Sequence, residues 1–202
     1  MNDMIEVFPY IFLLMALFFF LIGGSVIVKN RAIVFSARWF FGFLVFSFLP
    51  SIVMSVGWVF DERSTDMAMV EFVSPLMYVV MLFVFWRQMQ GAMIIGVTDD
   101  SLRKSIHFTL KEMNEDFEEA LSRIILKNKN TELNISMQSW MGSGQVRMKK
   151  HDDLFMKEYI LLSNRYFTTS GDRANRFTAY FYIIMGVFMI ASSVGMFSIP
   201  SL

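Results

Sequence analysis

Long apolar runs, three of them without any charge, dominate the pattern of this chain and predict four membrane-spanning helices. A bilayer core of about 30 Å needs roughly 20 apolar residues in a helix that rises about 1.5 Å per residue. The third run is the weakest, because Glu71 and Pro75 lie in its first part. The four predicted spans cover residues 7–28, 39–60, 67–86 and 177–197.

A different pattern follows the third run and predicts a domain that folds in water. The apolar run 92–97 is too short to span a membrane and lies between Gly91 and Asp99, which is typical of a buried strand. Strict alternation at Leu133, Ile135 and Met137 predicts a strand with one covered face. The predicted elements are a strand at 92–97, a helix from about 99, strands at 122–127, 131–140 and 145–150, and a helix from about 152.

This order, β-α-β-β-β-α, predicts a small two-layer α/β domain. Leu102, Ile106 and Leu110 share one face of the first helix, so we expect both helices to pack on one side of a four-stranded sheet. The strand order cannot be derived. The predicted fold is thus four transmembrane helices with a cytosolic α/β domain between the third and fourth. Its predicted segments are a membrane region 1–89, the domain 90–168, and a last region 169–202 with the fourth helix.

The placement of charge predicts the orientation. The segment between the first two spans holds Lys29, Arg31 and Arg38 and no acid, whereas Asp61–Asp66 is mainly acidic. Of the 18 basic residues, 14 lie between Arg87 and Arg176. Basic residues stay on the cytoplasmic side, so we expect residues 87–176 in the cytosol, both termini outside, and a bacterial inner-membrane type of location.

Composition narrows the classes of function. Apolar residues make up 55% of the chain, with 23 Phe and 18 Met, above the roughly 45–50% of soluble domains. Lys plus Arg and Asp plus Glu are 18 each, so no overall charge points to a nucleic-acid partner. Cysteine is absent, which excludes thiolate catalysis and thiolate metal sites.

Motifs that could carry catalysis have simpler structural interpretations. Two pairs of acids, Asp99–Asp100 and Asp152–Asp153, stand where helices begin, so we interpret them as helix caps rather than paired catalytic carboxylates. Because His151 directly precedes Asp152–Asp153, a metal site at this second pair is an alternative. Against it, neither His107 nor His151 has another histidine nearby in the sequence. Ser143, between two glycines, fits a hairpin turn better than a nucleophile elbow, because strands flank it. We therefore predict no catalytic, cofactor-binding or metal-binding residues.

Polar residues within the predicted spans have two possible roles, close packing between helices or the lining of a solute pathway. Ser47, Ser51 and Ser55 recur every fourth residue on the second span, and the fourth span is also rich in small residues. Such spacing favours close helix packing, while a hydroxyl-lined pathway is the alternative. Glu71 is the acid within a predicted span, and intramembrane acids are functional candidates.

A basic cluster lies near the predicted membrane surface. Arg147, Lys149 and Lys150 could contact anionic headgroups or could form a solvated strand edge. Together these features predict a non-catalytic membrane protein without cofactors, whose cytosolic domain binds, assembles with or regulates a partner at the bilayer. That partner is another protein or a second copy of the chain. The alternative is a small transporter or channel subunit that uses Ser47, Ser51, Ser55 and Glu71, with a membrane enzyme as a third hypothesis.

Overall fold

The computed structural model describes residues 7–59, 68–120, 122–150 and 152–198, without the side chains at 49–51, 53–59, 68–72, 74 and 75. These residues form six helices and one six-stranded antiparallel sheet. The chain divides into two compact units. The helical unit comprises Met1–Leu17, Arg38–Met89 and Val187–Leu202, and the α/β unit comprises Phe18–Ala37 and Gln90–Gly186.

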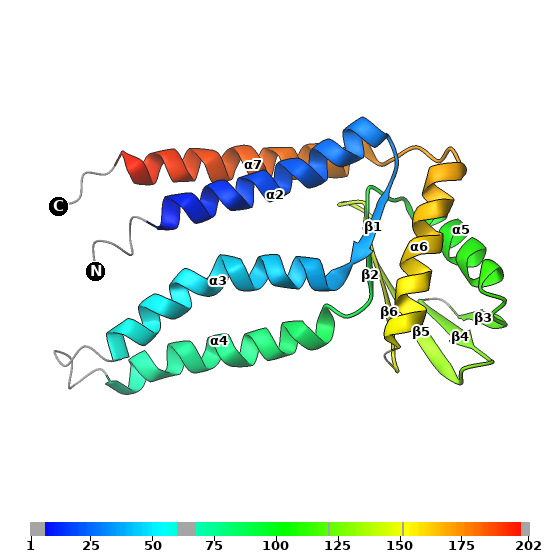
Figure 1. Ribbon diagram of the computed structural model, residues 1–202, viewed down its shortest axis with the longest axis horizontal. Coiled ribbons are helices and arrows are strands. Elements are labelled where there is room, and N and C mark those ends of the chain that lie inside the picture. Colours follow the sequence, from blue (N-terminus) through cyan, green and yellow to red (C-terminus); the bar gives the residue numbers. More distant parts are fainter. Residues whose placement is uncertain (1–6, 60–67, 121, 151, 199–202) are drawn as a thin grey trace. The chain divides into compact units, whose positions relative to one another are not determined.

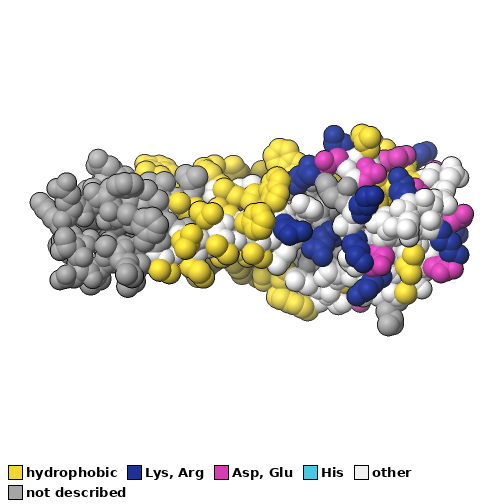
Figure 2. Space-filling view, turned by 90° about the horizontal axis from the view of Figure 1, so that it is seen from below, with side chains coloured by type: hydrophobic (Ala, Val, Ile, Leu, Met, Phe, Trp, Pro, Cys, Tyr) yellow, Lys and Arg dark blue, Asp and Glu magenta, His cyan; other side chains and the backbone are white. Residues whose placement is uncertain are grey.

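Apolar helices occupy all four places where spans are predicted. They are α2 (Phe8–Lys29), α3 (Ala37–Val59), α4 (Ala68–Gln88) and α7 (Arg176–Phe197). By length and composition alone, α2 and α7 could cross a membrane, and only 33% and 17% of their most apolar windows are buried. The apolar stretches described within α3 and α4, Ala37–Phe48 and Leu76–Gln88, are shorter than a membrane span. On the face that Figure 2 shows, charged side chains gather over the sheet-containing part of the chain.

The sheet has six strands rather than the predicted four, in the order β1-β2-β6-β5-β4-β3. The two strands that the sequence did not predict are at opposite edges. β1 lies between α2 and α3, in a segment predicted as a loop, and pairs with β2 through Val34 opposite Ile94. The strands are β1 (Ile33–Ser36), β2 (Ala92–Ile95), β3 (Phe117–Ala120), β4 (Arg123–Leu126), β5 (Thr131–Gln138) and β6 (Ser143–Met148).

Two helices, α5 (Asp99–Glu112) and α6 (Asp153–Thr169), cover one face of this sheet, as predicted (Figure 1). Alternate strand residues point toward them, and Ile94, Leu133 and Val146 are completely buried. From the helices, Ile106 and Tyr159 are completely buried in the same core. The apolar periodicities of the sequence therefore identify the face of each of these elements that forms the core.

Helix caps explain one acidic pair as predicted and correct the interpretation of the other. The Asp152 carboxylate accepts hydrogen bonds from Leu154 N at 3.0 Å and Phe155 N at 3.1 Å, so it caps α6. At α5 the cap is Thr98, which forms a capping box with Ser101. Asp99 and Asp100 instead lie in the first turn of α5, where their negative charges interact favourably with the positive end of the helix dipole.

The predicted connection between β5 and β6 is a tight turn, but it lies earlier than expected. Residues Ser139–Gly142 make the turn, and β6 begins at Ser143, whereas the sequence predicted a strand from 145. Gly142 has a φ of +57°. A strand follows the glycine, so the geometry is that of a hairpin and not of a phosphate loop, which needs a helix N-terminus.

Small residues bring α2 and α7 close together. A Cβ at Gly23 would lie 2.8 Å from Ala179 O, and a Cβ at Gly186 would lie 3.1 Å from the Phe20 ring. In the helical unit the buried Ser193 hydroxyl donates a hydrogen bond to Pro9 O at 2.9 Å. Small residues and an interhelical hydroxyl bond are what tight helix pairs in membranes use.

Candidate functional site

The α/β unit contains a junction at which four separate chain segments meet through backbone hydrogen bonds. Gly142 O accepts from both Gly96 N and Val97 N at 2.9 Å, and Asn175 N donates to Gly96 O at 2.9 Å. Ala174 N donates to Asn30 O at 3.2 Å. The end of α2, the end of β2, the β5–β6 turn and the start of α7 are therefore joined at one place.

Positive φ angles make this junction possible. Asn30, Gly96 and Gly142 have φ of 46°, 83° and 57°. Asparagine and glycine tolerate this left-handed conformation better than other residues. At Gly142 the space is also closed, because a Cβ would lie 2.2 Å from Thr178 Oγ1 and 2.7 Å from Asn175 Nδ2. The β5–β6 turn is thus held against the first turn of α7.

A cavity of about 350 Å³ adjoins the junction, between the end of α2 and the end of α6. Arg31 hydrogen-bonds Thr168 across it. The Tyr166 hydroxyl donates a hydrogen bond to Asp172 at 2.7 Å. Partial burial is the main cause that raises the pKa of Tyr166 to about 12, and the Asp172 carboxylate adds to it. Two basic side chains, Lys29 and Arg31, and one carboxylate, Asp172, line this cavity, so a small charged group could fit there. The lining residues are Lys29, Asn30, Arg31, Phe167, Thr168, Gly171 and Asp172.

Side chains from the helices contact both edge strands of the sheet. At the β1 edge, the Asn164 amide of α6 bonds the backbone of Val34. At the β3 edge, Glu119 pairs with Arg103 and with His107, whose Nε2 lies 2.7 Å from the carboxylate. Covered or charged edges do not accept a further strand.

The structure gives His107 and the acidic pair Asp99–Asp100 structural partners. The His107 ring packs against Phe117 at 5.2 Å, in addition to its bond to Glu119. Asp99 accepts a hydrogen bond from Ser139 at 2.9 Å. Asp100 lies 2.6 Å from Lys104, and this hydrogen bond raises the pKa of the lysine. His151 lies outside the described residues, among which no group of three His, Asp or Glu side chains could hold a metal ion.

The residues predicted to serve either helix packing or a solute pathway lie only partly within the described side chains. The Ser47 hydroxyl donates to Phe43 O at 2.8 Å, so it is satisfied within its own helix. Ser51 and Ser55 lie in α3 and Glu71 lies in α4, but their side chains lie outside the described part of the structure. The stripe therefore remains a prediction.

Arg147, Lys149 and Lys150, which could contact headgroups or form a solvated strand edge, lie at and just after the end of β6. Val146 and Met148 point into the core, so Arg147 and Lys149 lie on the sheet face that α5 and α6 leave open. Lys149 lies 3.4 Å from Glu132, which also lies 3.8 Å from Arg123. Lys150 follows the end of β6 and is exposed.

Sequence reasoning missed the junction and the edge bonds. The sequence carries little sign of them, because single asparagines and glycines such as Asn30, Gly96 and Asn164 occur in most chains. The glycines at 142 and 144 were interpreted correctly as part of a hairpin, but nothing local shows that the turn meets α7. Comparison with protein-family models, curated proteins and solved structures found no match to this chain.

Proposed function

We propose that the chain is a non-catalytic, four-span membrane protein whose α/β unit binds a protein partner at the cytosolic surface of the bilayer. Two helices apolar enough to cross a membrane, α2 and α7, support this proposal, as do the apolar stretches at the same places in α3 and α4. The basic residues of the α/β unit favour the cytosolic side. Both termini are then outside, as in a bacterial inner-membrane protein.

The observation that carries this proposal is the position of β1 in the sheet. β1 follows α2 closely and ends at Ser36, and α3 begins at the next residue, Ala37. β2 likewise begins four residues after α4 ends at Gln88. The segments that join the sheet to these apolar helices are therefore only a few residues long, too short to act as flexible linkers of a separate domain. Such an arrangement suits a protein that holds or regulates a partner beside the membrane.

The partner surface that fits best is the outer face of α6. Leu154 and Leu161 are 78% and 67% exposed and lie seven residues apart, so they share one face of the helix. Strand addition is less favourable for a partner, because Asn164 bonds the backbone of β1 and the β3 edge carries the charged Glu119. A partner with an apolar helix or groove fits this face instead.

Affinity purification of the full chain in mild detergent tests this function. We expect a stoichiometric protein partner, or a stable oligomer of the chain itself. The double variant Leu154→Lys/Leu161→Lys should lose that partner without a change in its melting temperature, because both side chains are exposed. Glu112→Lys, at an exposed position of α5, is the matched control and should retain it. A monomer without a partner, or a partner unaffected by the double variant, would contradict the proposal.

A further inference from the structure

Trp140 is a large apolar side chain exposed outside the apolar helices. It lies in the turn between β5 and β6, and 65% of its surface is exposed. Its ring packs edge-on against Phe181 of α7, with the ring centroids 6.0 Å apart. A turn in contact with water normally carries polar residues, so the tryptophan needs a different explanation.

The turn that carries Trp140 is fixed in place. Gly142 leaves no room for a Cβ beside Thr178, and its carbonyl accepts two backbone hydrogen bonds from Gly96 and Val97. On the other side of Trp140, the Ser139 hydroxyl donates to Asp99. The level of the indole ring along α7 is therefore determined by the fold and not by a mobile loop.

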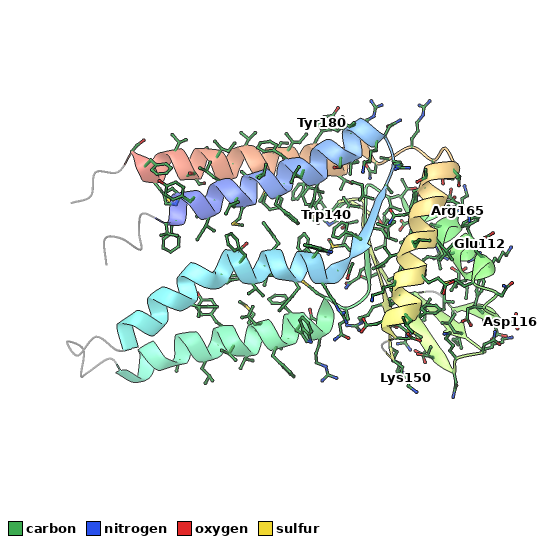
Figure 3. All side chains as sticks on the ribbon, in the orientation of Figure 1. Glu112, Asp116, Trp140, Lys150, Arg165 and Tyr180 are labelled. Carbon is green, nitrogen blue, oxygen red and sulfur yellow. The ribbon has the colours of Figure 1, made fainter. Side chains whose placement is uncertain are left out.

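That level corresponds to the interfacial layer of a bilayer. Phe181 is five residues past Arg176, which is about 7.5 Å at a rise of 1.5 Å per residue. Arginine marks the aqueous side of such a layer, and Trp and Tyr are enriched within it. Phe177 and Tyr180, on the same part of α7, are 57% and 54% exposed. Figure 3 shows Trp140 and Tyr180 near the same end of α7.

We infer that the β5–β6 turn is a membrane contact in its own right, with Trp140 inserted into the phospholipid interface beside the start of α7. The inference rests on the proposed membrane location of α7. An indole ring suits this layer because its apolar body reaches the acyl chains while its N–H donates to headgroup oxygens or water. The turn would then help to set the depth of the α/β unit at the bilayer surface.

Fluorescence quenching by brominated lipids tests this inference. The full chain with Trp39→Phe, Trp58→Phe and Trp86→Phe keeps Trp140 as its one tryptophan. It is reconstituted into phosphatidylcholine vesicles whose acyl chains carry bromine either near the glycerol or near the bilayer centre. We expect a blue-shifted emission and a larger loss of fluorescence with the shallow bromines. Should the triple variant fold poorly, the difference in quenching between the wild type and Trp140→Phe gives the same quantity.

Two reporter positions, each made with Trp140→Phe in the same background, separate the possible outcomes. Leu154→Trp, on α6, should not be quenched, and Ile184→Trp, on an exposed position of α7, should be quenched strongly. If Ile184→Trp is quenched and Trp140 is not, the membrane contact of the turn is refuted and the proposed function stands. Equal quenching at Leu154→Trp would also refute a contact specific to the turn. If Ile184→Trp is not quenched, α7 does not meet lipid and the proposed function fails first.

Discussion

The side-chain amide of Asn164 bonds both polar groups of the Val34 backbone. Its Oδ1 accepts from Val34 N at 3.3 Å, and its Nδ2 donates to Val34 O at 2.8 Å. One residue of α6 thus replaces a neighbouring strand at the free edge of β1. The same amide donates to Ile160 O at 3.0 Å, which fixes its orientation within the helix.

Replacing Asn164 should destabilise the α/β unit by more than is usual for a partly exposed residue, because its two bonds to the Val34 backbone are lost. Asn164→Leu keeps a similar volume but leaves the N–H and C=O of Val34 without these bonds, each at a cost of about 1–3 kcal/mol if water cannot reach them. We expect a lower melting temperature in detergent and more aggregation through the opened edge. Arg165→Leu changes an exposed neighbour and is the control. Equal melting temperatures for the two variants would show that the edge needs no cover.

Gly142 should be intolerant of any side chain. Gly142→Ala places a Cβ 2.2 Å from Thr178 Oγ1 in a left-handed conformation, so both a clash and backbone strain oppose it. Gly171 has a φ of +70° with nothing within 4 Å, so Gly171→Ala carries only the strain, about 1–2 kcal/mol. We expect a markedly larger loss of thermal stability for Gly142→Ala. Adding Thr178→Ala should restore part of that loss, and a failure to do so would argue against the contact.

Ser193 and Ser192 should differ in their tolerance of bulk. The Ser193 hydroxyl is buried and donates across to Pro9 O, whereas Ser192 donates to Phe188 O in its own helix. Ser193→Ala should be mild, since an interhelical hydrogen bond in a membrane is worth about 0.6 kcal/mol. Ser193→Leu should be severe, because it forces α2 and α7 apart, and Ser192→Leu should be close to wild type in a detergent melt. Similar melts for both leucine variants would contradict this pairing of the helices.

High pH should weaken the α/β unit through the buried Tyr159 and the half-buried Tyr166. Burial and Asp172 raise the pKa of Tyr166 from 10.0 to about 12, and burial also raises the pKa of Tyr159. The unfolded chain therefore releases these protons at a lower pH than the folded one, so stability is full below pH 10 and falls as the pH rises toward 12. Melting temperatures measured from pH 8 to 11 should show this fall. Tyr166→Phe should flatten the slope, and an unchanged slope in this variant would contradict the prediction.

The sequence predicted the elements whose patterns are local. Long apolar runs predicted α2, α3, α4 and α7, and the alternation at Leu133, Ile135 and Met137 predicted β5. Helical spacing at Leu102, Ile106 and Leu110 identified the covered face of α5. Each of these patterns reflects burial within one element, so a single segment carries enough information.

The elements that were missed depend on distant partners. β1 is only Ile33–Ser36, too short to show a period, and it becomes a strand because Ala92–Ile95 pairs with it some 60 residues later. β3 carries Glu118 and Glu119 and is stabilised by Arg103 and His107 from another element. The junction around Gly142 likewise depends on backbone bonds between segments far apart in sequence. Side-chain chemistry at one position does not reveal such contacts.

The most direct test of the four-span topology is the accessibility of single cysteines in intact cells, since the native chain has none. Ser122→Cys is suitable because the residue is exposed, whereas Ser143 is only 5% exposed and would be protected on either side. We predict that Ser64→Cys reacts with a membrane-impermeant maleimide outside the cell and that Ser122→Cys reacts only after permeabilisation. Labelling of Ser122→Cys in intact cells would contradict the cytosolic location of the α/β unit. Protection of both positions in intact cells would contradict the crossing of the membrane by α3 and α4.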